Sequence, residues 1–327
     1  MREIQFREAL REAMQEEMRR DDTVLLMGEE VAEYNGAYKV SQGMLDEFGP
    51  DRVIDTPIAE LGFGGIAVGA SANGLRPIVE FMTFNFSLVA IDQVINSAAK
   101  LMSMSGGQYS CPIVFRGPTG NAGQLSSQHS SNFENWFANT PGLKVVVPSN
   151  PADAKGLMKS AIRDNDPVIF MESEVMYGDK GLVPEGEYLI PIGKASVVKE
   201  GKDVTIVTFG KMLSRVVMPA VEELEKQGFS VEVIDLRTVR PIDYATVVES
   251  VKKTNRCVVV EEANPLAAIS SEITYHLQRW AFDYLDAPVV RVNSRDLPLP
   301  YAPTLIDEIL PSVERTIAAV KTVTYRK

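Results

Sequence analysis

The chain has 327 residues, of which 45% are apolar and 24% are charged, a composition typical of a globular protein and not of a disordered one. Its formal charge of −11 disfavours nucleic acid and anionic membranes as partners, because both are bound through clustered Lys and Arg side chains. The two Cys and two His residues are too few for a disulfide framework, a Cys-rich zinc site or a histidine metal cluster.

The first half of the chain alternates between helical and strand patterns, which predicts an α/β domain with a largely parallel sheet. Apolar residues at helical spacing predict helices at 6–20, 60–72, 88–102 and 152–163. Short apolar runs predict buried strands at 24–27, 53–55, 77–82, 112–115, 143–147 and 167–171.

Residues 177–191 are rich in Gly and Pro, as is typical of a linker. Beyond them the sequence predicts a second unit of βαβαβ type. Its strands are expected at 204–209, 231–235 and 257–261, and its helices at 213–227 and 244–253. We therefore expect an α/β protein of two domains with largely parallel sheets, residues 1–180 and 191–327.

The second unit lacks the motifs of nucleotide-binding enzymes. After the strand that ends at Phe209 the chain reads Gly-Lys-Met-Leu-Ser-Arg, with one glycine where a dinucleotide fingerprint has three. The sequence also has no Walker loop and no Gly-x-Ser-x-Gly elbow. A nucleotide-binding oxidoreductase that acts alone is an alternative that predicts saturable NAD binding, but assembly or packing is the favoured role of this unit.

No targeting or membrane segment is predicted. The first residues, Met-Arg-Glu-Ile-Gln-Phe, lack the apolar core of a signal peptide, and the longest apolar stretch, 78–91, is interrupted by polar residues. We expect a cytoplasmic protein, or one of the mitochondrial matrix or plastid stroma if a transit peptide has been removed.

Asp55-Thr-Pro-Ile-Ala-Glu60 is typical of a helix start, in which Thr56 caps the helix and Pro57 takes the first helical position. Glu60 would then lie in or just past the first turn. Two roles stay open for it. Its charge can complement the helix dipole, or it can lie near an apolar wall, where a raised pKa would let it share a proton with a ligand.

Two further segments also have two interpretations. Strand alternation places Met82, Phe84 and Phe86 on one side, where they form part of the core or an apolar floor for a flat heterocycle. The polar, Gly- and Ser-rich segment 116–133 is long for a connection, and such loops are often functional. It carries His129, which is either a solvated surface histidine or a site residue.

Several long blocks closely resemble the β subunits of pyruvate dehydrogenase E1, a family of thiamine-diphosphate-dependent 2-oxo acid dehydrogenases. The blocks include Asp55-Thr-Pro-Ile-Ala-Glu60, Glu80-Phe-Met-Thr-Phe-Asn-Phe86, Gln128-His-Ser130 and Asp235-Leu-Arg-Thr-Val-Arg-Pro241, and the resemblance covers essentially the whole chain. It implies a pyrimidine-binding thiamine-diphosphate fold followed by a transketolase C-terminal-like domain. It also implies an α2β2 heterotetramer with thiamine diphosphate at the α/β interface.

The resemblance implies roles for individual residues. Glu60 matches the carboxylate that hydrogen-bonds N1′ of the aminopyrimidine and thereby promotes ylide formation, and His129 matches an active-site histidine that assists proton or acyl transfer. Met82 and Phe86 match residues that pack around the aminopyrimidine. The implied potassium ligands are Ile113, Ala161, Ile162, Asp164 and Asp166, several through backbone carbonyls. Asp286 matches a contact to the subunit-binding domain of E2.

The implied reaction is the decarboxylation of pyruvate and the reductive acetylation of the lipoyl domain of E2, the dihydrolipoyl acetyltransferase. Thiamine enzymes hold Mg²⁺ and diphosphate with a Gly-Asp-Gly motif, for which this chain has only Gly178-Asp-Lys180. We therefore expect the α subunit to hold Mg²⁺, and the β subunit alone to be inactive. An acetoin or branched-chain 2-oxo acid dehydrogenase subunit and a non-catalytic assembly subunit are the remaining alternatives.

Overall fold

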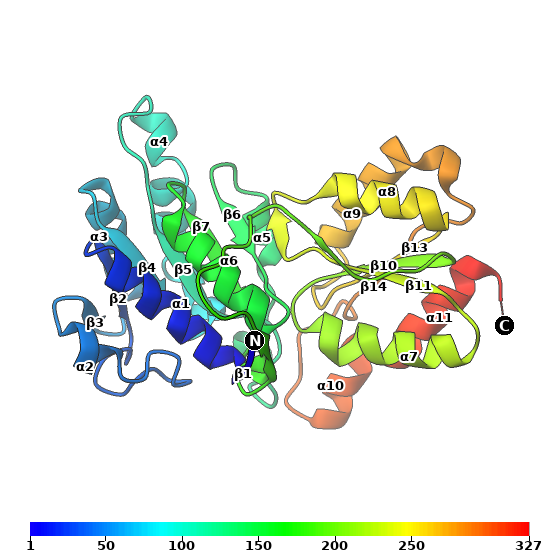
Figure 1. The fold of residues 1–327 in the computed structure, drawn as a ribbon, viewed down its shortest axis with the longest axis horizontal. Helices are drawn as coiled ribbons and strands as arrows, with labels where there is room; N and C mark the ends of the chain where they lie inside the picture. Colours follow the sequence, from blue (N-terminus) through cyan, green and yellow to red (C-terminus); the bar gives the residue numbers. More distant parts are fainter. Residues whose placement is uncertain (327) are drawn as a thin grey trace. The chain divides into compact units, whose positions relative to one another are not determined.

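In the computed structural model, which describes residues 1–326, the chain divides into two units, each with its own sheet (Figure 1). Unit 1 comprises Met1–Thr119 and Trp136–Ile192. Unit 2 comprises Gly120–Asn135 and the chain from Gly193 onward. The polar loop that carries His129 is thus grouped with the second half of the sequence.

The sheet of unit 1 is parallel, with neighbouring strands in the order β6-β7-β5-β4-β2-β3. Its strands are β2 (Val24–Gly28), β3 (Val53–Asp55), β4 (Arg76–Glu80), β5 (Val114–Pro118), β6 (Lys144–Val146) and β7 (Val168–Glu172). The central strands are buried on both faces, which is why they read as continuous apolar runs. All six predicted strands are confirmed, with only their ends displaced.

Helices flank this sheet. They are α1 (Phe6–Arg20), α2 (Met44–Phe48), α3 (Glu60–Ala72), α4 (Leu101–Met104) and α6 (Pro151–Arg163), with shorter turns η1 (Phe84–Leu88), η2 (Gln93–Ala98) and η4 (Glu174–Met176). α1 and α6 lie side by side (Figure 1) and share a core that includes Phe6, Leu10 and Leu157. The helix predicted at 88–102 is wrong as one element, because the segment contains the π-helix η2 and then α4. Apolar spacing over so few turns does not distinguish α from π hydrogen bonding.

The predicted linker is partly structured. Residues 180–183 form β8 (Lys180–Val183), which pairs antiparallel with β1 (Arg2–Gln5). Three of the four residues in β8 are exposed or half-buried. Such a strand lacks the apolar alternation by which strands are detected in a sequence, so its composition indicated only a linker.

Unit 2 has the strand order β14-β13-β10-β11-β9, parallel except for β9. Its strands are β9 (Ser196–Lys199), β10 (Val204–Thr208), β11 (Val231–Asp235), β12 (Thr238–Arg240), β13 (Cys257–Val260) and β14 (Val290–Val292). Its helical segments are η3 (Ser127–His129), η5 (Leu213–Val217), α7 (Met218–Lys226), α8 (Tyr244–Thr254), α9 (Ile269–Trp280), η6 (Phe282–Tyr284), α10 (Pro303–Ile309) and α11 (Val313–Thr324), while α5 (Glu134–Ala138) begins in the loop. The predicted βαβαβ unit is confirmed, except that the helix predicted at 213–227 begins as the π-helix η5 and continues as α7.

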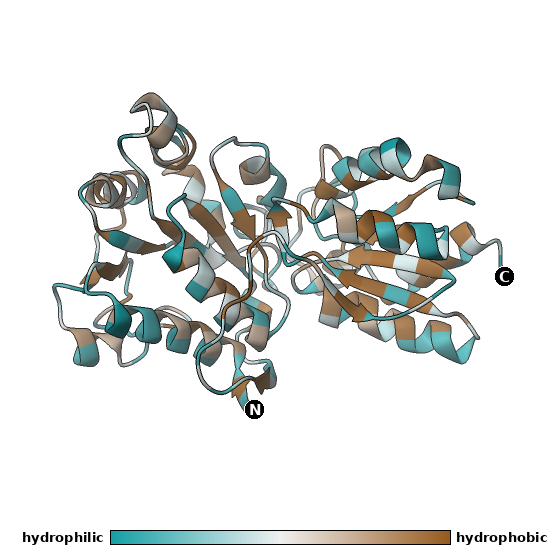
Figure 2. Ribbon diagram, turned by 45° about the horizontal axis from the view of Figure 1, so that its top comes forward, coloured by the Kyte–Doolittle hydropathy of each residue, from teal (hydrophilic) through white to brown (hydrophobic). Residues whose placement is uncertain are grey.

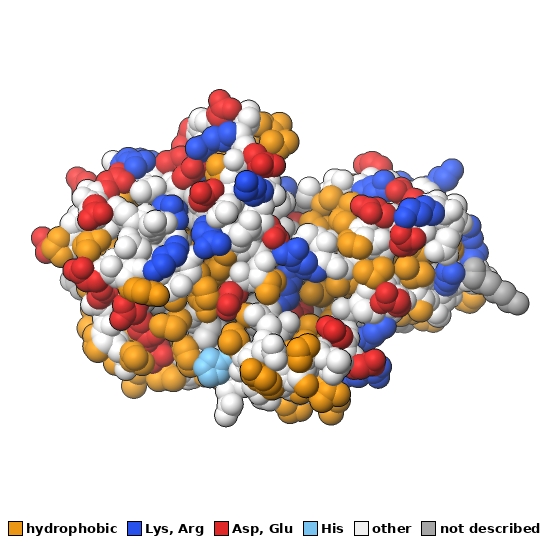
Figure 3. Space-filling model, turned by 90° about the horizontal axis from the view of Figure 1, so that it is seen from below, with side chains coloured by type: hydrophobic (Ala, Val, Ile, Leu, Met, Phe, Trp, Pro, Cys, Tyr) orange, Lys and Arg blue, Asp and Glu red, His pale blue; other side chains and the backbone are white. Residues whose placement is uncertain are grey.

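Hydropathy follows this layering. The strands of both sheets are mostly hydrophobic, whereas the helices alternate between apolar and polar faces (Figure 2). On the face drawn in Figure 3, acidic and basic side chains lie interspersed. Among residues 1–326 no helix combines the length and apolar character needed to cross a bilayer.

Candidate active site at the ends of the parallel strands

The carboxyl ends of three adjacent strands lie level in unit 1. In the register of the sheet, Gly28 of β2 pairs with Asp55 of β3 on one side and with Glu80 of β4 on the other. Glu29 directly follows β2, Glu60 begins the helix after β3, and Met82 follows β4. Open parallel sheets bind their ligands at this edge, so the fold brings these residues to the expected place for a site.

Glu60 is the first residue of α3, which confirms its predicted position in the first turn. The predicted cap is wrong, because the residue before the helix is Ala59, with no side-chain cap. The N–H of Thr56 instead donates to the carbonyl of Gly28 at 2.9 Å, which extends the strand ladder. A residue before proline favours extended backbone, so the helix begins after the Thr-Pro step.

Glu29 and Glu60 form a buried acidic pair. Their side chains belong to residues only 4% and 5% exposed, and Oε1 of Glu29 has no hydrogen-bond partner. Burial, followed by the charge of Glu60 and a hydrogen bond with it, raises the pKa of Glu29 to about 7. Glu29 is therefore partly protonated near neutral pH and can donate this proton in a hydrogen bond to its neighbour.

Glu29 is not among the site residues predicted from the sequence. The feature that could have identified it is its position directly after a buried parallel strand. Asp55 fixes the turn there, because its carboxylate accepts the N–H groups of Ala32 and Glu33 at 2.7 and 3.0 Å. At Gly28 an added Cβ would lie 2.5 Å from the carbonyl oxygen of Glu80, so only glycine allows the strands to approach this closely.

The three predicted floor residues do not lie on one side. β4 ends at Glu80, and Phe84 begins the 3₁₀ turn η1, in which strand alternation no longer applies. Phe84 is fully buried, with its ring 5.8 Å from Phe81 and 5.9 Å from Phe137. Met82 and Phe86 are half-buried. Phe84 therefore belongs to the core, and only the other two are open to a ligand.

Beneath this edge lies a buried ion-pair network. Arg116 of β5 donates through Nε to Glu172 of β7 at 2.7 Å and forms an ion pair with Glu80 of β4. The hydroxyl of Tyr177 donates to Glu172 at 2.7 Å. One guanidinium thus joins the ends of three strands under the residues that follow β4.

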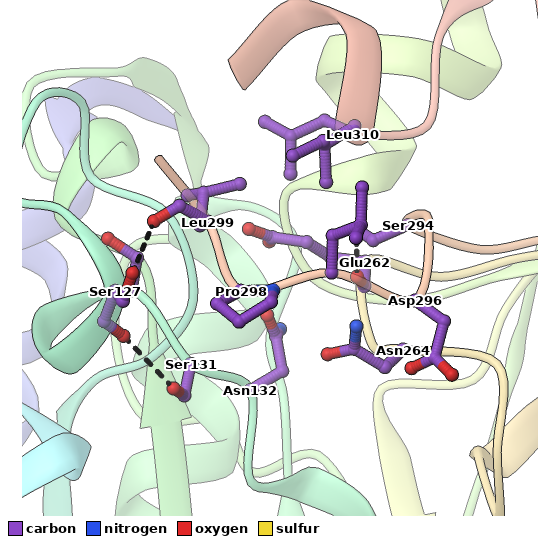
Figure 4. Close-up of a pocket in the computed structure, with 13 residues that line it drawn as sticks. Ser127, Ser131, Asn132, Glu262, Asn264, Ser294, Asp296, Pro298, Leu299 and Leu310 are labelled. Carbon is purple, nitrogen blue, oxygen red and sulfur yellow. Dashed lines mark hydrogen bonds between the residues drawn. The ribbon is translucent and has the colours of Figure 1, made fainter. Parts of the chain in front are cut away.

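His129 is an exposed residue of the loop in unit 2. Because β5 continues to Pro118, this loop begins later than predicted. It covers a pocket of about 360 Å³ at the ends of β13 and β14 (Figure 4). The pocket is lined mainly by serine hydroxyls, amides, carboxylates and leucines, among them Ser127, Ser130, Asn132, Glu262, Asp296 and Leu299. Ser127 donates to the carbonyl of Leu299 at 2.8 Å.

The five residues predicted to bind potassium lie around the end of α6 and the starts of β5 and β7. Nζ of Lys144 contacts the carboxylates of Asp164 and Asp166 at 2.6 and 3.0 Å. Arg76 donates to the carbonyl oxygens of Ile162 and Asp164 at 3.1 and 2.9 Å. The side-chain charges are thus compensated internally, and each backbone carbonyl in this segment has two lone pairs.

Asp286 lies in unit 2 between η6 and β14. Its carboxylate pairs with Arg256 at 2.9 Å, and its side chain is 55% exposed. An exposed, singly paired carboxylate of this kind is accessible to a basic partner.

Family models divide the chain into two known domains. The transketolase pyrimidine-binding domain matches residues 2–180, and the transketolase C-terminal domain matches residues 193–316. A solved structure titled as a split-gene transketolase, an inactive β4 tetramer, superposes with a TM-score of 0.80 at 23% identity and covers 99% of both chains. That likeness shows the fold.

Curated relatives are similar over nearly the whole chain. The pyruvate dehydrogenase E1 component subunit beta of Rickettsia felis is 55% identical over 99% of both chains. The same subunit of Rhizobium meliloti is 55% identical over all of this chain and 71% of its own. A mitochondrial subunit beta-2 of Oryza sativa is 52% identical over 99% of this chain and 87% of its own.

Proposed function

This chain belongs to the pyruvate dehydrogenase E1 β-subunit family, and on that premise we propose that Glu60 controls the proton on which pyruvate decarboxylation depends. Thiamine diphosphate supplies the electron sink for the charge left when CO₂ departs. The observation that carries the proposal is the buried Glu29–Glu60 pair at the ends of β2 and β3.

The residues at this edge fit a thiamine pyrimidine. Glu60 would hold a proton against N1′ of the ring, and the unpartnered Oε1 of Glu29 shows that the pair has unused hydrogen-bonding capacity. Met82 and Phe86, half-buried after β4, would pack against the ring faces. A neighbouring carboxyl whose pKa is raised to about 7, that of Glu29, suits proton transfer in both directions.

The site is one half of an active site. Within residues 1–326, no three His, Cys, Asp or Glu side chains are grouped to hold a metal ion. We infer that Mg²⁺ and the diphosphate are held by the E1 α subunit. The start of α3 supports a partner surface there, because Ile58, Leu61 and Ile66 are 83%, 50% and 65% exposed beside Glu60.

Transfer to E2 involves other residues. We propose that His129 assists transfer of the acetyl group to the lipoyl domain, which its exposed position in a polar loop supports. Asp286 would contact the basic subunit-binding domain of E2, which its exposed carboxylate supports. The acidic net charge of the chain is consistent with such a partner.

The chain alone is expected to turn over no pyruvate, and addition of the α subunit with thiamine diphosphate and Mg²⁺ is expected to produce lipoamide-dependent turnover. The measurement compares pyruvate, acetoin and 3-methyl-2-oxobutanoate as substrates for the chain alone and for the complex. Pyruvate should have the highest kcat/KM. A higher value for either competitor would overturn the assignment to pyruvate, and turnover by the chain alone would contradict the shared site.

We propose that K⁺ binds among Ile113, Ala161, Ile162, Asp164 and Asp166, several of them through backbone carbonyls. A K⁺ concentration of ten times the Kd would stabilise the fold by about 1.4 kcal/mol. This is equivalent to a Tm increase of about 3–6 °C for a unit of this size. Thermal unfolding of the chain in KCl, NaCl and choline chloride at equal ionic strength measures this. Equal Tm values in the three salts would exclude the site.

A further inference from the structure

Two buried side chains hold both backbone polar groups of Asn121, at the start of the loop that carries His129. Nζ of Lys211 donates to the carbonyl oxygen of Asn121 at 2.5 Å. Oε1 of Glu262 accepts the N–H of Asn121 at 2.6 Å. Lys211 and Glu262 also form an ion pair with each other at 2.7 Å. We refer to Lys211 and Glu262 as the peptide clamp.

The peptide clamp is carried by the sheet of unit 2. Lys211 lies three residues beyond the end of β10, and Glu262 lies two residues beyond the end of the adjacent parallel strand β13. Both residues are 7% exposed. A buried ion pair adds little net stability because both charges lose hydration. Its specific effect here is geometric, since each charge is directed at one peptide group.

A glycine next to Asn121 allows the loop to approach the peptide clamp closely. Gly120 has a φ of +74°, and a Cβ at this position would lie 2.7 Å from Oε2 of Glu262. A side chain at Gly120 would therefore both strain the backbone and displace the carboxylate. The close approach that the clamp requires is built into the loop sequence.

The rest of the loop is held more weakly. Ser127 bonds the carbonyl of Leu299, and Asn135 bonds the carbonyl of Ala267, each through one neutral hydrogen bond. Around His129 the residues Gln124, Leu125 and Gln128 are exposed, whereas Ser130 and Phe133 further along the loop are buried. Charge-assisted bonds are about twice as strong as neutral ones, which makes the clamp the strongest of these anchors.

We propose that Lys211 and Glu262 are positioning residues that fix the loop in the conformation in which His129 serves acyl transfer. The inference rests on the function proposed above for His129. The residues of unit 2 that follow β10 and β13 would thus influence the reaction by holding a peptide group of the loop, without contacting substrate.

The test uses Lys211→Met, Glu262→Met and the double variant, each assembled with the α subunit. The double variant leaves no unpaired buried charge, so it is expected to fold even if a single variant does not. We expect kcat with lipoamide to fall at least tenfold and the KM for pyruvate to change less than twofold. Lys211→Arg, which keeps the cation and its donors, should restore most of the rate. Lys226→Met, at an exposed lysine of α7, is the matched control and should have no effect.

A double-mutant cycle with His129→Ala separates positioning from a general structural effect. If the clamp acts through His129, Lys211→Met will cause no further loss in that background. An equal further loss there, or wild-type kcat in all three clamp variants, would overturn the proposal. Hydrogen exchange of the peptide 119–135 should be at least tenfold faster in the clamp variants. This readout needs no catalysis, so it tests the clamp even if the wild-type complex proves inactive with lipoamide.

Discussion

Glu60→Gln is expected to lower the kcat/KM for pyruvate at least about a thousandfold, which corresponds to about 4 kcal/mol of transition-state stabilisation. Gln keeps the size and hydrogen-bonding shape of the side chain but neither takes up nor releases a proton. Gln at this position would also remove the carboxyl that, together with burial, raises the pKa of Glu29 to about 7. Steady-state turnover of the complex with the α subunit measures the loss.

The matched control is Glu30→Gln, which makes the same change at an exposed residue next to the pair. This variant should keep turnover within about twofold. The Tm of Glu60→Gln should not fall, because the substitution removes a buried charge that faces Glu29. If Glu60→Gln retained turnover within fivefold, the role of Glu60 would be reduced to complementing the dipole of α3.

Local sequence signals located the frame of this site. β3 and α1 have the predicted bounds, because a buried apolar run and an amphipathic stripe are read from neighbouring residues alone. Glu60 was placed correctly in a first turn for the same reason. The family resemblance then implies the proton-transfer role, which spacing alone left open beside the helix-dipole role.

Other features depend on contacts that are distant in sequence. The predicted cap at Thr56 is wrong because α3 begins only at Glu60, while Thr56 continues the ladder beside β2 through its N–H to the carbonyl of Gly28. Phe84 was grouped with Met82 because local alternation does not show where a strand ends. The proton-sharing role of Glu29 requires Glu60, which lies on a different element. Pairings of this kind follow from strand register, which a single sequence does not specify.

The buried network under the site leads to a prediction of similar size for stability. Arg116→Met is expected to lower the free energy of unfolding by about 3–5 kcal/mol, because it leaves the carboxylates of Glu80 and Glu172 buried without their cation. Urea unfolding of the chain followed by circular dichroism measures the change. Arg19→Met is the matched control, since Arg19 forms an exposed ion pair with Glu47 and should cost less than about 1 kcal/mol.

The pH dependence of this loss has a definite sign. Burial already raises the pKa of Glu80, with the Arg116 charge opposing the increase. Without Arg116 the pKa of Glu80 in the folded state rises further above its value in the unfolded state. The loss of stability is therefore greatest at a pH where the carboxyl is ionised in the unfolded state but resists ionisation in the folded state. The destabilisation should therefore be largest at pH 8 and shrink as the pH falls and the buried carboxyl becomes protonated in the folded state of the wild type as well as of the variant. A loss that did not depend on pH would mean that Arg116 stabilises β4, β5 and β7 by packing and not through its charge.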